Sequence, residues 1–435
     1  MRRLRLAILS LPFAALALGC PLASAVDSGT VDAPTFSPAG GSFTSDQSVS
    51  LSDATIGAAI YYTLDGSTPS ASSTLYAGPI AVKGPSNTKT IRAIAAKAGM
   101  TSSSPASATY LVNTTFAWTD VTPSGQAHSQ SWTGIASSAD GSHLAGEVDG
   151  GDIWTSSDYG ASWTNRTTGT AFSGLNWTSI ASSADGSHLF ASVGADGAGD
   201  LYTSPDYGAT WTDRTPSGAT HNQKWWGIAS SSDASHLSAI MNVGDIWTST
   251  DFGASWTDRT STGPANNQYW NSIASSADGS HLAAVSVYGD VWTSSDFGAT
   301  WTDRSTTSPM QGQLWRSIAS SADGSRLAAV NMVDIWISGD YGATWTDQTA
   351  SGPAHSLSWY GIASNADGSR LAAFDSGSGP GDIWGSADYG ATWTDGTPTG
   401  AAHNLVWDSI ASNADGSRLV AVDGAGDIWI WAQLP

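Results

Sequence analysis

Cysteine is nearly absent from this sequence, since Cys20 is the only one among its 435 residues. A disulfide framework is therefore excluded, and we expect packing alone to stabilise the fold. Positive charge is also scarce, because 16 Lys and Arg stand against 37 Asp and Glu and give a net charge of −21. Such a chain repels phosphate groups, so we expect no nucleic-acid partner and no attraction to an anionic membrane surface.

The N-terminus has the pattern of an export signal. Three of residues 2–5 are Arg, an apolar run covers residues 6–18, and small residues follow at 23–25. This predicts a signal peptide over residues 1–25, with an apolar run too short to span a bilayer. Cys20 resembles the lipidated cysteine of a bacterial lipobox, which gives an outer-membrane lipoprotein anchored only by its lipid; cleavage after residue 25 instead gives a freely secreted protein. Both alternatives place the product at the cell surface or outside the cell.

Residues 33–112 form a block of their own. Short alternating runs are separated there by Gly, Pro and Ser turns, a pattern typical of a small antiparallel β-sandwich. Segments 61–69, 76–80 and 91–95 resemble the Ig-like domain at the C-terminus of chitobiases and β-hexosaminidases. The resemblance implies an accessory domain without catalytic activity.

From residue 114 to residue 435 one unit recurs about every 45 residues. Each copy contains Trp-x-x-Ile-Ala-Ser, an Asp-Gly-Ser turn in most copies, and two further strand patterns, so it predicts four short strands. The tryptophans that open the seven copies are Trp132, Trp177, Trp225, Trp270, Trp315, Trp359 and Trp407. Residues 116–120 reproduce a fourth strand, and the last copy lacks one. We therefore predict an all-β chain in which a seven-bladed β-propeller, closed by a blade split between its two ends, follows the Ig-like sandwich.

A second motif, Ser-x-Asp-x-Gly-x-Ser/Thr-Trp, lies between the third and fourth strands of six copies. Its aspartates are Asp158, Asp206, Asp251, Asp296, Asp340 and Asp388. The motif resembles the Asp-box, or BNR, repeat, which implies a propeller fold. That family includes sialidases, but their six blades and Tyr-Glu nucleophile do not match this chain, in which Glu147 is the only Glu.

The strand that opens each copy is the candidate ligand site. A polar residue stands four positions before most of its tryptophans: His128, His221, His355, His403, Asn266 and Gln311. An aromatic ring beside a polar donor is how a sugar is held, so these residues and the seven tryptophans predict shallow carbohydrate pockets. The alternative is that the tryptophans are core and the polar residues complete loops. At another position His143, His188, His236 and His281 alternate with Arg326, Arg370 and Arg418, which argues against a metal ligand and predicts a solvated edge.

Acidic residues that break the repeat predict a second candidate site. Glu147, Asp149, Asp196, Asp375 and Asp423 are placed in the loop between the second and third strands, and Asp408 follows the opening Trp of the last copy. The four copies that contain these acids adjoin once the ring closes. Two functions fit such a rim: a divalent cation site or a carboxylate pair for glycoside hydrolysis. The alternative is that these are turn residues, and no catalytic residue is assigned. Apart from that cation, we expect no metal or cofactor.

The sequence thus favours an exported, monomeric, non-catalytic binding module that recognises carbohydrate or a cell-surface partner through the propeller rim. A glycoside hydrolase that uses the acidic loops is the first alternative. A protein-binding scaffold or assembly factor is the second.

Overall fold

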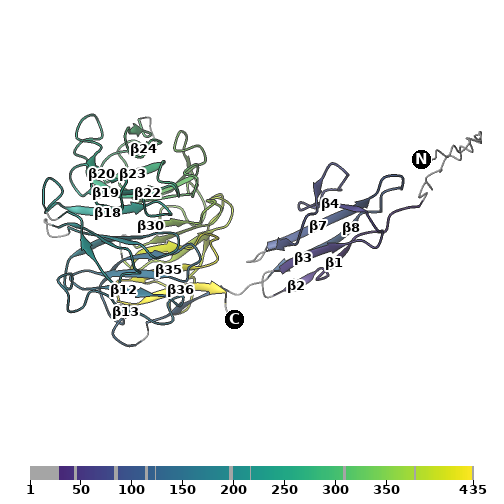
Figure 1. Cartoon of the computed structure of the whole chain (residues 1–435), viewed down its shortest axis with the longest axis horizontal. Helices are drawn as coiled ribbons and strands as arrows, with labels where there is room; N and C mark the ends of the chain where they lie inside the picture. The colour runs from purple at the N-terminus through teal and green to yellow at the C-terminus, as the bar shows by residue number, and fades with distance from the viewer. Residues whose placement is uncertain are drawn as a thin grey trace, which may run out of the picture. The chain divides into compact units, whose positions relative to one another are not determined.

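The computed structural model describes residues 29–43, 47–82, 87–112, 116–122, 124–194, 199–215, 217–306, 310–376 and 379–433. The chain divides into two compact units, Met1–Thr115 and Phe116–Pro435 (Figure 1). Both consist of strands, turns and loops over these residues, which confirms the all-β prediction. Within them, no helix has the length and apolar character needed to cross a membrane. The predicted signal peptide and Cys20 lie outside the described residues.

The first unit contains two sheets. One has the order β1 (Thr35–Ser37), β3 (Gln47–Ser52), β6 (Ile80–Val82); the other has the order β2 (Gly41–Phe43), β8 (Ala106–Val112), β7 (Asn87–Ala96), β4 (Ala59–Thr63), β5 (Thr74–Leu75). Every second residue of β3 points inward, and Val49, Val82, Ile91 and Tyr110 form a core with no solvent exposure. This alternation is the reason why the segment folds as strands with one buried face.

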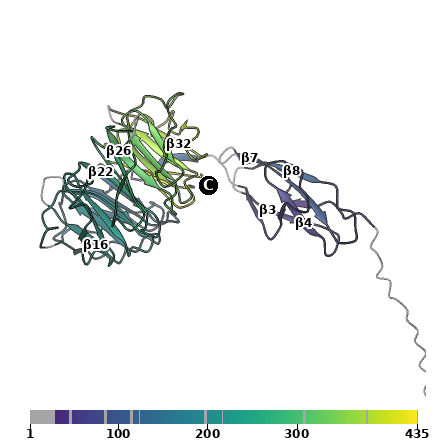
Figure 2. The same cartoon turned by 90° about the horizontal axis from the view of Figure 1, so that it is seen from above.

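The second unit contains seven four-stranded antiparallel sheets among its described residues, numbered here sheet 1 to sheet 7. Sheet 1 has β10 (Trp132–Ser137), β11 (Leu144–Val148), β12 (Ile153–Ser156) and β13 (Thr164–Asn165); sheet 2 has β14 (Trp177–Ser182), β15 (Leu189–Val193), β16 (Leu201–Ser204) and β17 (Thr212–Asp213). Sheet 3 has β18 (Trp225–Ser230), β19 (Leu237–Met241), β20 (Ile246–Ser249) and β21 (Thr257–Asp258); sheet 4 has β22 (Trp270–Ser275), β23 (Leu282–Ser286), β24 (Val291–Ser294) and β25 (Thr302–Asp303). Sheet 5 has β26 (Trp315–Ser320), β27 (Leu327–Asn331), β28 (Ile335–Ser338) and β29 (Thr346–Asp347); sheet 6 has β30 (Trp359–Ser364), β31 (Leu371–Asp375), β32 (Ile383–Ser386) and β33 (Thr394–Asp395). Figure 2 shows strands of sheets 2, 4, 5 and 6 (β16, β22, β26, β32) following one another in chain order.

Sheet 7 combines the two ends of this unit. Its strands are β34 (Trp407–Ser412), β35 (Leu419–Asp423), β36 (Ile428–Gln433) and β9 (Phe116–Asp120). Strand β9 pairs antiparallel with β36, and Trp118 lies opposite Trp431. In Figure 1 the yellow β36 lies beside the blue strands of sheet 1. The predicted sharing of one sheet between the two ends is therefore seen in the pairing.

Neighbouring sheets are joined by backbone hydrogen bonds between their Asp-Gly-Ser turns or equivalents. The series of 2.7–2.8 Å bonds runs from the N–H of each residue to the carbonyl of the next: Ala139, Ala184, Ser232, Ala277, Ala322, Ala366, Ala414 and back to Ala139. The Asp of the turn is also engaged: Asp140 accepts from the Ser142 N–H and from two Ser hydroxyls, which lowers its pKa to about 2. Most repeated aspartates thus shape turns, as expected from their regularity.

A side-chain stack also links most neighbouring sheets. It places a His or Arg after the turn of one sheet against the Asp-box aromatic of the next: His143 on Tyr207, His188 on Phe252, His236 on Phe297, His281 on Tyr341, Arg326 on Tyr389 and Arg418 on Tyr159. The predicted solvated edge was therefore wrong for these residues. Cation–π and aromatic contacts explain why His and Arg both serve at this position.

Candidate binding site at the channel mouth

The first strand of every sheet contains a β-bulge. In sheet 1, Trp132 pairs with Val148 and Gly134 with Glu147, so Thr133 between them is left without a partner. The same shift occurs in the other six sheets. A bulge turns the extra residue out of the ladder and re-aims its side chain.

The bulged residues of all seven sheets line one cavity of about 310 Å³. They are Thr133, Thr178, Trp226, Asn271, Arg316, Tyr360 and Asp408. Each first strand contacts the first strand of the next sheet, and β10 contacts β34. A cavity bounded by all seven first strands lies on the axis they surround, and we refer to its bulge end as the channel mouth. Unlike the tryptophan before it, the bulged residue differs between most sheets.

Three of these residues form a connected chain, in which Arg316 takes part through its backbone. The Trp226 Nε1–H donates to Asn271 Oδ1 at 3.2 Å, and the Asn271 amide donates to the Arg316 carbonyl oxygen at 2.6 Å. Trp226 keeps 37% of its surface exposed. The mouth therefore offers an accessible indole whose orientation is fixed by its neighbour.

Arg316 continues this arc. Its guanidinium lies 4.9 Å from the ring centroid of Tyr360, and Nη2 approaches the Met332 sulfur at 3.2 Å. Its buried Nε has no hydrogen-bond partner among the described residues. A guanidinium held on an aromatic face in the lining of the cavity is suited to bind an acceptor that enters the mouth.

Asp408 provides the negative charge of the mouth. It is accessible through the cavity, yet surrounding protein atoms partly desolvate it, and this effect with repulsion from Asp423 raises its pKa to about 6. Arg316 and Asp408 belong to sheets 5 and 7, with Tyr360 of sheet 6 between them in chain order. The mouth thus combines both signs of charge with two aromatic rings.

An apolar rim adjoins the mouth on sheets 3 to 5. Its exposed side chains belong to loops that lead into the first strands or connect the second and third strands: Val243, Tyr269, Tyr288, Leu314 and Val333. Tyr269 and Tyr288 meet edge to face with centroids 6.1 Å apart, and Tyr288 is 72% exposed. Several large apolar groups exposed together on one face mark a binding surface more often than isolated ones do.

The tryptophans predicted to hold sugars do not form accessible platforms. All seven are only 0–1% exposed and pack within clusters drawn from two adjacent sheets. In sheet 1, for example, Trp132 contacts the rings of Trp154 and Trp163. The core alternative therefore describes Trp132, Trp177, Trp225, Trp270, Trp315, Trp359 and Trp407, because the bulge exposes the next residue and turns the indole inward.

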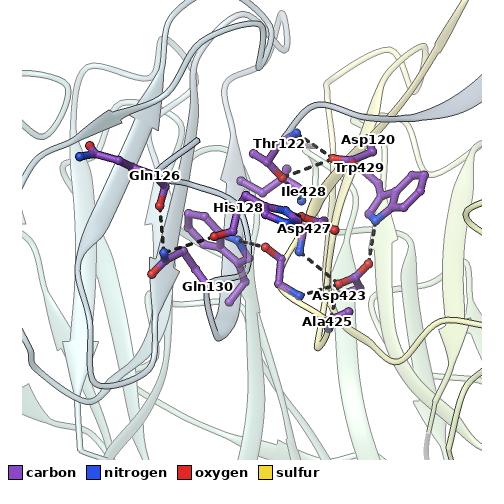
Figure 3. A network of polar contacts seen from close by, with 12 residues as sticks. Asp120, Thr122, Gln126, His128, Gln130, Asp423, Ala425, Asp427, Ile428 and Trp429 are labelled. Atoms are coloured by element: carbon purple, nitrogen blue, oxygen red, sulfur yellow. Dashed lines mark hydrogen bonds and ion pairs between the residues drawn. The ribbon is translucent and has the colours of Figure 1, made fainter. Parts of the chain in front are cut away.

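The polar residues predicted beside them mostly secure loops. His128, His221 and His403 lie 2.6, 3.0 and 2.8 Å from the aspartates that precede the third strands, and Asn266 donates to its equivalent at 3.4 Å. His355 lies 2.9 Å from the Thr349 carbonyl oxygen and 3.9 Å from the equivalent aspartate, Asp334, and Gln311 is exposed. Figure 3 shows His128 against Asp427 at the seam of sheet 7. These contacts favour the loop interpretation for the histidines and Asn266.

The acidic residues that were predicted to form one rim lie in different environments. Asp423 is 1% exposed and accepts from three backbone N–H groups and the Trp429 indole, so it closes a turn (Figure 3). Asp375 accepts from the Asp382 N–H, and burial raises its pKa. Asp149 is exposed, whereas Asp196 lies outside the described residues. Among the residues that the structure describes, no group of three His, Cys, Asp or Glu could hold a metal ion.

Glu147 was wrongly placed in a loop by the sequence prediction. It lies in β11 opposite Gly134, with no exposure and neither carboxyl oxygen hydrogen-bonded among the described residues. A Cβ on Gly134 would come within 2.6 Å of Glu147 Oε1, so the glycine makes the space for this side chain. Desolvation, with repulsion from Asp149, raises the Glu147 pKa well above its ordinary value. Burial therefore favours the protonated form of this carboxyl group.

Sequence reasoning missed the bulged residues as a set. The signal was present, since the position after each opening Trp varies from Thr to Trp, Asn, Arg, Tyr and Asp while the surrounding motif is kept. A variable residue inside an otherwise fixed strand points to a position released from packing.

Comparisons with known proteins support the fold. The family model of the chitobiase/β-hexosaminidase C-terminal domain matches residues 38–107, and that of the BNR-Asp box repeat matches residues 291–303. Both resemblances drawn from the sequence are thereby confirmed. No curated protein matches the chain in sequence.

Solved structures show the same architecture. YCF48 bound to D1 peptide is 16% identical, with a TM-score of 0.55 over 73% of this chain and 96% of that one; YCF48 from Cyanidioschyzon merolae is 13% identical, with a TM-score of 0.54 over 73% and 99%. A GH74 enzyme of Niastella koreensis is 19% identical over 67% of this chain and 53% of that one, with a lower TM-score of 0.40. The likeness to the two YCF48 structures establishes a β-propeller fold and no activity.

Proposed function

We propose that the second unit is a non-catalytic binding module that holds a polypeptide segment of its partner at the channel mouth. The proposal rests on the seven bulged residues that line one cavity. Among them are the chemically different side chains of Trp226, Arg316, Tyr360 and Asp408. A cavity lined by different side chains can recognise a ligand made of different chemical groups, such as a polypeptide.

The mixed chemistry of this face favours a polypeptide. Aromatic rings and the apolar rim fit apolar side chains, while Arg316 and Asp408 fit a carboxylate or carbonyl and a cation respectively. Buried aromatic anchors and Arg are the residues that contribute most to protein interfaces. YCF48, with the same fold, has been solved with a bound peptide.

The other functions predicted from the sequence receive less support at this face. A sugar site on the opening tryptophans requires accessible indoles, and these are sealed. Hydrolysis requires two carboxyl groups that face one substrate. Of the candidate acids, Asp423 and Asp375 accept turn amides and Glu147 is enclosed.

A random peptide library selected on the full chain tests the proposal. We expect enriched sequences that combine apolar residues with charge, and binding to them should fall at least tenfold in Trp226→Ala/Tyr360→Ala, because each anchor contributes about 1–2 kcal/mol or more. Thr133→Ala, at the equivalent bulge of sheet 1, is the matched control and should bind within twofold of the unmodified chain. Selected peptides that bind the double variant equally well would reject the channel mouth as the site.

Three structural expectations belong to the same proposal. The seven sheets are taken as the blades of one propeller closed through β9, supported by the hydrogen-bond series that returns to Ala139. The first unit is taken as an Ig-like accessory domain, supported by the family match over residues 38–107. The protein is taken to be monomeric and exported, either secreted or lipid-anchored at Cys20, on the pattern of residues 1–25.

A further inference from the structure

A second cavity lies between sheets 4 and 5, at the ends of the strands that carry the Asp-box turns. It encloses about 280 Å³ and is lined by His281, Thr293 and Arg304 of sheet 4 and by Tyr341 of sheet 5. The bulged residues of the channel mouth lie at the start of the first strands, the opposite end of the sheets from the Asp-box turns, so the two cavities open on opposite faces. Pockets for small ligands begin at roughly 300 Å³, which makes this cavity suitable for one small ring.

Arg304 provides an oriented positive charge in this cavity. Its Nε–H donates to Thr293 Oγ1 at 2.7 Å, which fixes the plane of the guanidinium. No hydrogen bond or ion pair with a described residue engages its two Nη groups, although the chain contains 37 acidic residues. A fixed guanidinium with both Nη groups available matches the two oxygens of a carboxylate.

Tyr341 supplies the apolar wall. Its ring stacks on His281 with centroids 4.8 Å apart, and 44% of the residue stays exposed. Thr300 and Thr302, both exposed, line the same cavity with hydroxyl groups. An aromatic face flanked by hydroxyls and a cation is suited to a sugar ring that carries an acid group.

Each of the other junctions between sheets also has an Arg side chain, although the position of this Arg in the repeat changes. Sheets 1 to 4 combine a His after the turn with a Thr and Arg pair on the third and fourth strands: Thr155 with Arg166, Thr203 with Arg214, Thr248 with Arg259 and Thr293 with Arg304. In sheets 5 to 7 the Thr and Arg pair is replaced by Ile337 with Gln348, Gly385 with Gly396 and Ile430 with Val121, and the His becomes Arg326, Arg370 or Arg418. Every junction therefore keeps one Arg, supplied by one of two strands.

The cavities at two other junctions are much smaller than the one between sheets 4 and 5. The equivalent cavity between sheets 1 and 2, beside Arg166 and Tyr207, encloses about 20 Å³. The one between sheets 5 and 6, beside Arg326 and Tyr389, encloses about 10 Å³. These two have the cation and the ring but no room for a ligand.

We propose that the cavity between sheets 4 and 5 binds a uronic acid residue of an acidic glycan. The carboxylate pairs with the Nη groups of Arg304, and the pyranose ring rests on Tyr341. This site is independent of the polypeptide site at the channel mouth.

Trigalacturonic acid and neutral galactotriose are the probes, titrated by calorimetry into the full chain. We expect binding of the acidic trisaccharide only, weakened at least about tenfold in Arg304→Gln by loss of a bidentate charge-assisted pair. Arg166→Gln makes the same change at the small cavity and should bind within twofold. Gln already occupies this position in sheet 5, so both variants should keep the unmodified Tm.

A second variant tests the site without removing Arg304, so that the result does not depend on the stability of Arg304→Gln alone. Thr302→Trp, at an exposed position of the cavity wall, should abolish binding by filling the space while leaving Arg304 in place. The proposal fails if the unmodified chain does not bind the acidic trisaccharide, if galactotriose binds equally well, or if Arg304→Gln and Thr302→Trp bind as the unmodified chain does. It also fails if acetate competes at the same concentration as the trisaccharide, because the site would then recognise the anion alone.

Discussion

The amide of Ala414 donates to the carbonyl oxygen of Ala139 at 2.8 Å, and this bond joins sheet 7 to sheet 1. The two residues occupy the same position of their repeats, and the bond repeats the geometry found between all other neighbouring sheets. Arg418 on Tyr159 links the same two sheets, while β9, which leads into sheet 1, pairs with β36 inside sheet 7. The two ends of this unit are thus joined by the same contacts as internal sheets, with one additional strand pairing.

Deletion of residues 116–120 should open this seam. Strand β36 would lose its partner and present an unpaired edge, which templates association between chains. We expect a lower Tm and soluble oligomers by size-exclusion chromatography. Thr119→Ala, which keeps the backbone of β9, should leave both unchanged; a monomeric deletion variant of normal Tm would show that β9 does not close the sheet.

Adjacent tryptophans in sheet 3 should differ sharply in their effect on stability. Trp225 has no exposure, whereas Trp226 occupies the bulge and is 37% exposed. Trp225→Ala should lower the free energy of unfolding by about 3–5 kcal/mol, because it leaves a large cavity in the core. Trp226→Ala should cost no more than about 1 kcal/mol. Denaturant titration of both variants measures the difference, and equal losses would contradict the assigned burial.

Glu147 should make the protein less stable as pH rises. Its pKa is raised in the folded state, so between the unfolded pKa near 4.5 and the folded value the native chain binds one more proton than the unfolded chain. The contribution of Glu147 is full below pH 4.5 and is lost progressively above it. The Tm of Glu147→Gln minus that of the unmodified chain should therefore increase from pH 4 to pH 8. A difference that does not change with pH would mean that Glu147 titrates normally.

Asp408 should impose a pH dependence on ligand binding. With a pKa of about 6, its ionised fraction rises from about one tenth at pH 5 to about nine tenths at pH 7. A selected peptide whose cation contacts Asp408 should bind up to roughly tenfold more tightly at pH 7 than at pH 5. Asp408→Asn should remove this dependence. If the pH profile persists in the variant, another group is responsible.

The propeller fold was predictable because the same four-strand sequence pattern recurs seven times in the chain. Periodic tryptophans, Asp-box turns and the displaced strand at 116–120 each predict the architecture on their own, and they agree. Prediction of the binding site failed because one extra residue, the bulge, changes which side chains of the opening strand face the core. Alternation alone cannot reveal the bulge at Thr133 and its equivalents, which exchanges the inward and outward sides of the opening strand.

The location of Glu147 was predicted wrongly for a related reason. Its sequence neighbours Asp149 and Gly150 indicate a loop, but the space that accommodates the side chain is created by Gly134 on another strand. The cavity beside Arg304 also depends on two sheets, so neither copy of the repeat contains it. Both the space around Glu147 and the cavity beside Arg304 are formed by separate segments of the chain. A pattern within one segment therefore cannot predict them.

The pairing of β9 with β36 also sets an order of events during synthesis. Strand β9 leaves the ribosome before any other strand of its unit, and its partner leaves last. Sheet 7 cannot form until both ends of this unit have been synthesised, and contacts this distant in sequence form slowly. A chain shortened by its final strand leaves β9 unpaired however well its other sheets fold. The seam therefore makes a complete sheet 7 depend on synthesis of the entire unit.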